Sequence, residues 1–177
     1  MARCRALLLL LLAAAAPATG PQPPCAIRLD MVPNAPRFED FAAPVAPPVL
    51  RPKRPVLDTA DKRRYRTRIT EGAEEGERFA GRFTLATWGC GTQCLQFAII
   101  DPASGAVFYR DPNGIAGAPW HEGYFEFRRD SRLIVLVGER LDTTGRDRTG
   151  VFYLEWTGTT LRELRFEPQE KVCRREE

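Results

Sequence analysis

The sequence has one histidine, His121, in 177 residues. A cysteine nucleophile such as Cys90 needs a neighbouring base, and no local motif connects His121 to a cysteine. Metal binding is also poorly supported, because two closely spaced cysteines are too few ligands for zinc. The sequence therefore predicts no metal, no cofactor and no catalytic residues, and it favours a non-catalytic protein over an enzyme.

The chain also lacks a strong excess of charge of either sign. It has 26 Lys and Arg residues against 23 Asp and Glu residues. Removal of residues 1–18 would take away Arg3 and Arg5 and no acid, which leaves 24 basic residues against 23 acidic ones. A nearly neutral protein gives no electrostatic argument for nucleic-acid binding.

Long apolar runs are missing after the first one. Arg3 and Arg5 precede an unbroken apolar run over residues 6–16, and small-residue triplets at its end are candidate cleavage sites. This pattern is typical of a secretory signal peptide, here over residues 1–18. The run is shorter than the about 20 residues that a transmembrane helix needs. We therefore expect export to the periplasm or the medium, with no transmembrane segment after signal removal.

Cysteine usage agrees with export. Cys4 leaves with the signal, and four cysteines remain: Cys25, Cys90, Cys94 and Cys173. An even number in an exported chain indicates two disulfides, with three possible connectivities. A glycine-flanked turn can bring the Cα atoms of Cys90 and Cys94 within about 7 Å, so this local pair is the simplest choice. Cys25 then pairs with Cys173.

Prolines recur every few residues between positions 19 and 55. Proline fixes φ and donates no backbone hydrogen bond, so this segment is neither a regular helix nor an interior strand. We expect a strap or linker over residues 19–56. It precedes a β-rich domain at 57–167 and a C-terminal tail at 168–177. The predicted apolar anchors of the strap are Phe38, Phe41, Val45, Val49 and Leu50.

One helix is predicted, over residues 58–71. Thr59 can cap its start, Asp61 lies in its first turn, and Gly72 can end it. Tyr65 and Ile69 are four residues apart and form a narrow apolar stripe. This stripe can dock on a sheet.

The rest of the domain alternates short β-rich runs with turn signals. Loops are expected at residues 110–123 and 138–149. Seven strands after one helix predict a mainly β fold, an antiparallel meander that forms a sandwich or barrel with blade-like sheets. The expected strands are residues 82–88, 95–101, 106–109, 124–127, 133–137, 151–156 and 161–166.

The block WGCGTQC at residues 88–94, with RFAGRF at 78–83 and AIIDPASGAVF at 98–108, resembles a family of short exported bacterial proteins of uncharacterised function. The family pattern is approximately N-F-A-G-H-Y, then W-G-C-G-T-x-C, then I-I-D or I-V-D and T-G-x-V-Y. The similarity covers about residues 57–166. Arg82 stands where the family has histidine. The resemblance implies a bacterial envelope protein with one common domain, and it implies no activity.

The same block supplies the first candidate site. Backbone N–H groups at its glycines can form an anion-binding nest; the alternative is that the glycines only allow a tight turn. Aromatic side chains can line a cleft for a glycan or peptide; the alternative is that they form the core. The residues predicted for this site are Trp88, Gly89, Gly91, Thr92, Arg82, Trp120 and His121.

A basic cluster is the second candidate. It can face anionic envelope material such as lipid head groups or acidic polysaccharide. The alternative is a solvated helix face whose positive charge nearby glutamates balance. The cluster consists of Arg51, Lys53, Arg54, Lys62, Arg63, Arg64, Arg66 and Arg68.

These features predict an exported, non-catalytic envelope binding or interaction module. Its partner would be an unidentified envelope component, which is a protein, a glycan or an anionic lipid surface. The alternative function is a small envelope hydrolase with a cleft around Trp88, Trp120 and His121.

Overall fold

The computed structural model describes residues 26–27, 29–91, 94–109, 114–116, 125–141 and 146–174. Nine strands form one antiparallel sheet in the order β10-β9-β8-β6-β4-β3-β2, with β5 paired to β4 and β7 paired to β8. Two further strands, β1 and β11, pair with each other. The strands are β1 (Ala26–Ile27), β2 (Glu77–Phe79), β3 (Phe83–Gly91), β4 (Cys94–Ile100), β5 (Val107–Phe108), β6 (Gly114–Ala116), β7 (Phe125–Phe127), β8 (Leu133–Leu141), β9 (Asp147–Trp156), β10 (Leu161–Pro168) and β11 (Cys173–Arg174).

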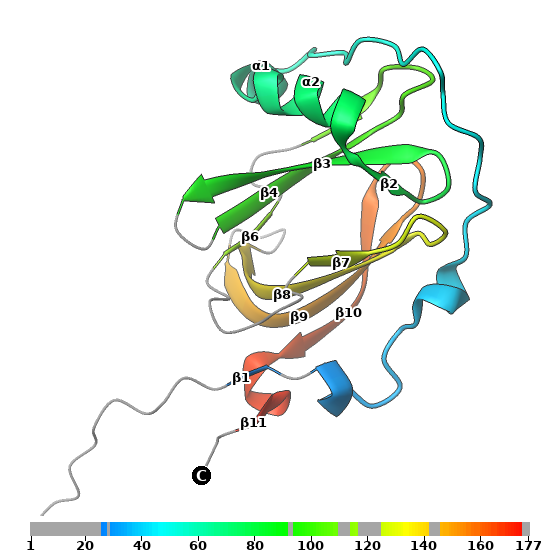
Figure 1. The fold of residues 1–177 in the computed structure, drawn as a ribbon. Coiled ribbons are helices and arrows are strands. Elements are labelled where there is room, and N and C mark those ends of the chain that lie inside the picture. The colour runs from blue at the N-terminus through cyan, green and yellow to red at the C-terminus, as the bar shows by residue number, and fades with distance from the viewer. Residues whose placement is uncertain are drawn as a thin grey trace, which may run out of the picture.

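The large sheet folds over on itself, so that β2, β3 and β4 lie above β7, β8 and β9 (Figure 1). β6 joins the two halves because it pairs with both β4 and β8. Alternate residues of each strand point into the space between the halves. This inner core includes Leu85, Phe97, Leu136, Phe152 and Trp156, all of which are buried. The chain is therefore mainly β and sandwich-like, as the sequence predicts.

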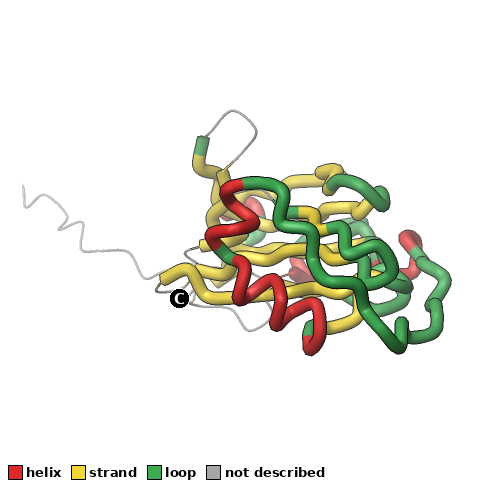
Figure 2. The backbone as a smooth tube through the Cα atoms, turned by 90° about the horizontal axis from the view of Figure 1, so that it is seen from above, coloured by secondary structure: helices red, strands yellow, loops and turns green. Residues whose placement is uncertain are grey.

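Helices α1 (Ala60–Arg64) and α2 (Arg66–Glu75) lie over the outer face of the β3 half, as Figure 2 shows from above. Thr59 Oγ1 accepts a hydrogen bond from the backbone N–H of Lys62 at 3.3 Å and caps α1, as predicted. Ile69 is fully buried against Ala86 and its neighbours on the sheet. The predicted docking stripe is thus in place.

The predicted helix end at Gly72 is wrong. The helix is interrupted at Tyr65, which separates α1 from α2. α2 then continues to Glu75, and Gly76 after it has an extended backbone conformation. Gly72 is instead the point where α2 meets the sheet, because a Cβ atom there would lie 2.1 Å from the Cβ atom of Ala86. Its missing side chain allows close packing and does not terminate the helix.

A second outer layer covers β8 and β9 on the opposite side of the molecule. Val135 and Val151 from these strands pack against Ile27, Val32 and Val172. Figure 1 shows β1 and β11 below the sheet, at the bottom of the molecule. The sequence predicts residues 168–174 as part of a tail. In the structure Pro168 ends β10, Gln169–Lys171 form a 3₁₀ turn and Cys173–Arg174 pair with β1 as β11.

The proline-rich segment runs up one side of the molecule from β1 to α1 (Figure 1). Phe38 and Phe41 pack on the second outer layer, as predicted. Val45 and Leu50 are not anchors, because they are 43% and 94% exposed. Four backbone N–H groups fix the strap to turns of the domain: Ala43 to the Asp130 carbonyl at 2.7 Å, Ala46 to Gly81 at 3.1 Å, Lys53 to Pro102 at 2.9 Å and Val56 to Gly105 at 2.8 Å.

Every predicted strand has a counterpart, but two predicted loops are partly wrong. The loop expected at 110–123 contains β6, which the sequence does not predict. The loop expected at 138–149 is shorter, because β8 and β9 stay paired as far as Leu141 and Asp147. Their polar ends carry no apolar alternation, so only the pairing with a neighbouring strand identifies them as strands.

Candidate binding surface

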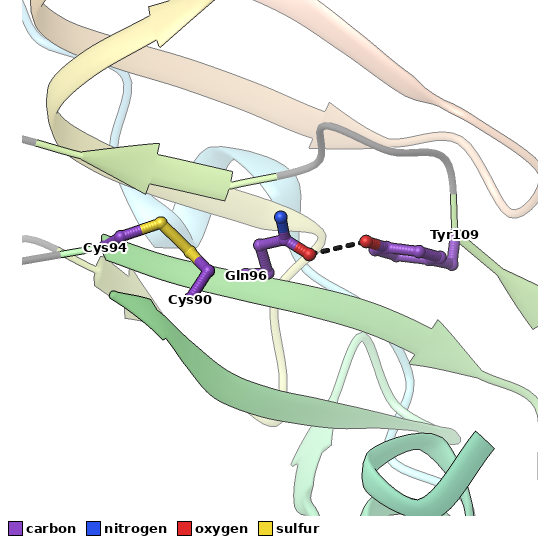
Figure 3. Close-up of a disulfide and its surroundings, with 4 residues drawn as sticks. All are labelled: Cys90, Cys94, Gln96 and Tyr109. Carbon is purple, nitrogen blue, oxygen red and sulfur yellow. Dashed lines mark hydrogen bonds between the residues drawn. A yellow bond between two sulfur atoms is a disulfide. The ribbon is translucent and has the colours of Figure 1, made fainter. Parts of the chain in front are cut away.

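The β3–β4 hairpin is held at its tip by the disulfide Cys90–Cys94, which confirms the predicted local pair. The two Cα atoms lie 5.1 Å apart (Figure 3). The register shifts between Gly89 and Gly91, so Cys90 lies at a β-bulge. Gly89, Cys90 and Gly91 are exposed. The tip is thus a solvent-facing turn whose shape a covalent bond fixes.

Cys173 is also disulfide-bonded. Its predicted partner, Cys25, lies outside the described residues. The β1–β11 pair places Ala26 opposite Arg174 and Ile27 opposite Cys173. The chain that directly follows Cys25 therefore runs beside Cys173.

β3 has a free edge over residues 86–91. β2 pairs with residues 83–85 of β3 only, and no other described strand pairs on that side. α2 packs on the outer face of β3, where Gly72 comes close to Ala86. Backbone N–H and C=O groups that point outward from this edge have no partner among the described residues.

The free edge of β3 carries neither a charged residue nor a proline that would oppose pairing with another chain. Its sequence, ATWGCG over residues 86–91, has no charge and no proline. Edge strands commonly use charged side chains and prolines to prevent such pairing. The other edge of the sheet, β10, has this protection in Arg162, Glu163, Arg165, Glu167 and Pro168.

The two glycines at the tip differ in what the fold requires of them. Gly91 has φ +143°, a conformation that favours glycine. Gly89 has no positive φ, and a Cβ atom there would meet only the Cys94 carbonyl oxygen at 3.8 Å, an ordinary contact. Packing within the described chain therefore does not require glycine at position 89. A strand glycine of this kind can mark a place where another backbone approaches closely.

Trp88 lies beneath the helices and does not line a cleft. It is 5% exposed, and its ring centroid lies 5.3 Å from those of Tyr65 and Tyr109. The Tyr109 hydroxyl donates a hydrogen bond to Gln96, further along β4 from the disulfide (Figure 3). Trp156 is buried as well, in the inner core. For these two tryptophans the alternative of a core role holds.

The remaining residues predicted for the first site are not gathered around Trp88. Arg82 lies before the start of β3, at the opposite end from the tip, where its guanidinium pairs with Asp101 at 3.2 Å and covers the Phe83 ring at 4.9 Å. Thr92, Trp120 and His121 lie outside the described residues. The structure thus brings together only Trp88, Gly89 and Gly91, with the tryptophan facing inward.

Some side chains of the basic cluster bond to neighbouring groups of the helices, and others have no acidic partner among the described residues. Lys62 Nζ lies 2.6 Å from Asp58 Oδ1, and this hydrogen bond lowers the pKa of the Asp58 carboxyl. Arg68 pairs with Glu71 at 3.3 Å, and Arg63 donates to the Asp58 carbonyl at 3.1 Å. These side chains stabilise the helices locally. The members whose side chains are exposed and have no acidic partner among the described residues are Arg51, Lys53, Arg54 and Arg66.

The described residues provide neither a free cysteine nucleophile nor a metal site for hydrolysis. Cys90 and Cys94 are bonded to each other, so neither provides a free thiolate. Within the described ranges no group of three His, Cys, Asp or Glu side chains is placed to hold a metal. The buried Trp88 removes one wall of the cleft that the hydrolase alternative requires.

Comparisons with family models, with curated proteins and with solved structures found no match to this chain. The resemblance to exported bacterial proteins with a W-G-C-G-T-x-C block stays a prediction. No helix within the described residues is long and apolar enough to cross a membrane.

Proposed function

We propose that this protein is an exported, non-catalytic interaction module that binds an extended segment of an envelope protein at the free edge of β3. The observation that carries the proposal is the unpaired, uncharged edge over residues 86–91 beside a disulfide-closed tip. An added strand would satisfy the outward backbone groups of this edge, which is how many domains bind peptides.

The β3–β4 hairpin is held rigid, which favours such binding. β4 pairs with β3 along its whole length, and the disulfide and bulge fix the end of the hairpin. A rigid edge loses little conformational entropy when a partner strand adds to it. Gly89 has no side chain, and a strand glycine can mark a place where another backbone approaches closely.

Export is supported by the state of the cysteines. Cys90, Cys94 and Cys173 are all in disulfides. Stable structural disulfides are typical of oxidising compartments outside the cytosol. This agrees with the signal peptide predicted over residues 1–18.

The test is capture of partners from envelope extract by the mature protein and two variants. Gly89→Lys places a charged side chain at the free edge, and the position has internal room for a Cβ atom. Thr159→Lys, at the exposed turn between β9 and β10, is the matched control. We expect the wild type and T159K to capture the same protein, with at least about tenfold less capture by G89K, which corresponds to about 1.4 kcal/mol.

Equal capture by all three proteins would refute binding at the β3 edge. Retention on anionic lipid or acidic glycan would instead place the site at Arg51, Lys53, Arg54 and Arg66. That retention would weaken as salt rises, because exposed charges are screened, whereas strand pairing depends on backbone hydrogen bonds. The salt dependence therefore separates the proposed protein partner from the two anionic partners.

A further inference from the structure

The inner face of the β8–β9 pair changes from apolar to cationic toward one end. Phe152 of β9 belongs to the inner core. Side chains alternate between faces, so Arg148, four residues earlier on β9, lies on the same face. The register places Arg140 of β8 directly opposite Arg148. Two guanidinium groups therefore project side by side from the inner face of the sheet.

Arg148 is held firmly by its neighbours. Its Nη1 and Nη2 atoms donate to the two carboxylate oxygens of Glu163 on β10, at 3.1 and 2.7 Å. Its guanidinium carbon lies 4.6 Å from the Phe166 ring centroid and 5.2 Å from that of Phe152. The side chains of Arg148 and Glu163 are 27% and 38% exposed, so the group is in contact with solvent.

Arg140 has no comparable partner. Its guanidinium makes no hydrogen bond or ion pair within the described part of the chain, although the residue is half-buried. Desolvation lowers its pKa, Glu163 opposes that shift, and Arg148 adds to it. The acids next in sequence, Glu139 and Asp147, are one residue away along their strands and lie on the opposite face of the sheet.

The arrangement is unfavourable without a further anion. Like charges directly opposite each other on neighbouring strands repel. A partly buried guanidinium also loses hydration that only hydrogen bonds can replace. Glu163 is bonded to Arg148, so Arg140 has no carboxylate of its own among the described residues. An anion beside Arg140 would supply hydrogen-bond acceptors and balance its charge.

We propose that Arg140 and Arg148 form a binding site for a singly charged oxyanion, the carboxylate or phosphodiester group of an organic ligand. Arg140 supplies a planar fork of N–H donors that matches two oxygens of such a group. Arg148 contributes its charge from a fixed position, and Glu163 disfavours anions of higher charge. The site is separate from the β3 edge, and it gives the protein a second, small-molecule ligand.

The test is an NMR titration of the mature protein with benzoate, dimethyl phosphate and sulfate. Backbone amides of Gly138, Arg140, Arg148 and Gly150 report on the site. We expect saturable shifts with benzoate or dimethyl phosphate, and weaker binding of doubly charged sulfate. Benzoate binding alone would identify a carboxylate ligand, and dimethyl phosphate binding alone would identify a phosphodiester.

Three variants separate the proposal from a general effect of charge. Arg140→Gln should raise the Kd by at least about tenfold. Arg140→Lys keeps the charge and the fold but loses the bidentate fork, so it should give an intermediate Kd. Arg129→Gln removes an exposed arginine in the turn before β8 and should leave the Kd within about twofold. G89K should bind the probes as the wild type does, whatever its effect on partner capture.

An unchanged Kd in R140Q would overturn the proposal. So would the absence of saturation up to about 50 mM probe, since the Kd would then lie beyond the weak millimolar range of specific sites. Tighter binding of sulfate than of either singly charged probe would contradict the assigned ligand charge.

Discussion

Gly72 is a residue at which α2 comes very close to the sheet. A Cβ atom there would lie 2.1 Å from the Cβ atom and 2.7 Å from the Cα atom of Ala86. Both distances are too short for real contacts, so any side chain would push the helix away from β3. From the sequence alone this glycine predicts a helix end, because the chain does not reveal which residue lies opposite it.

Gly72→Ala should destabilise the protein by about 1–3 kcal/mol through overpacking. Alanine gains about 1 kcal/mol of helix propensity over glycine, which offsets only part of that loss. Urea unfolding of the mature protein measures the difference. Thr67→Ala, at an exposed position of the same helix, is the control and should change stability by no more than about 0.5 kcal/mol. A G72A protein as stable as the wild type would show that α2 can move without cost.

Arg140 and Arg148 are residues that the sequence does not single out. Each is one of many arginines in the chain, and neither belongs to a motif. Their meeting depends on the register of β8 and β9, in a region that the sequence predicts as a loop. The surplus of cationic over acidic groups at that place is visible only after the strands are paired.

Among the elements, the β3–β4 hairpin is the best predicted and the most informative. Alternating apolar residues indicate both strands, and the spacing of Cys90 and Cys94 predicts their disulfide correctly. The free edge could not be predicted, because it depends on the short β2, which covers only three residues of β3. β2 and β6 are too short to show a period of their own.

Replacing both Cys90 and Cys94 by serine should cost about 2 kcal/mol in unfolding free energy, since the closed loop is short. Denaturant unfolding under non-reducing conditions measures this loss, with Thr159→Ser as the control. The fold should survive, because the inner core does not depend on the tip. Partner capture should weaken as well, because the edge would lose part of its rigidity. Undiminished stability in the double variant would mean that the bond does not constrain the hairpin.

At the scale of the whole molecule, the fold is a folded-over sheet covered on both outer faces. α1 and α2 cover one face, and the start of the strap with β1 and β11 covers the other. Apolar alternation predicts the sandwich, and the prolines predict the strap. The sequence does not show which outer face each segment covers, because both faces present similar apolar side chains.

In the same arrangement, the edge of β3 over residues 86–91 has no neighbouring strand among the described residues. Among the described strands, β10 is charged along its edge, whereas the free part of β3 has no charge, and we propose that another chain joins the sheet there. This is the central claim of the proposed function. It concerns backbone amides, so it is best tested by a method that observes them directly.

Hydrogen–deuterium exchange of the mature protein, alone and with the captured envelope partner, is that measurement. We expect the amides within residues 86–91 that point outward from the sheet to exchange at least about tenfold more slowly in the complex, because new strand pairing protects them. Amides of β10, the charged edge, should exchange at an unchanged rate. Protection that falls on β10 or on the strap, with none at residues 86–91, would contradict the claim that the partner binds as a strand at the free edge of β3.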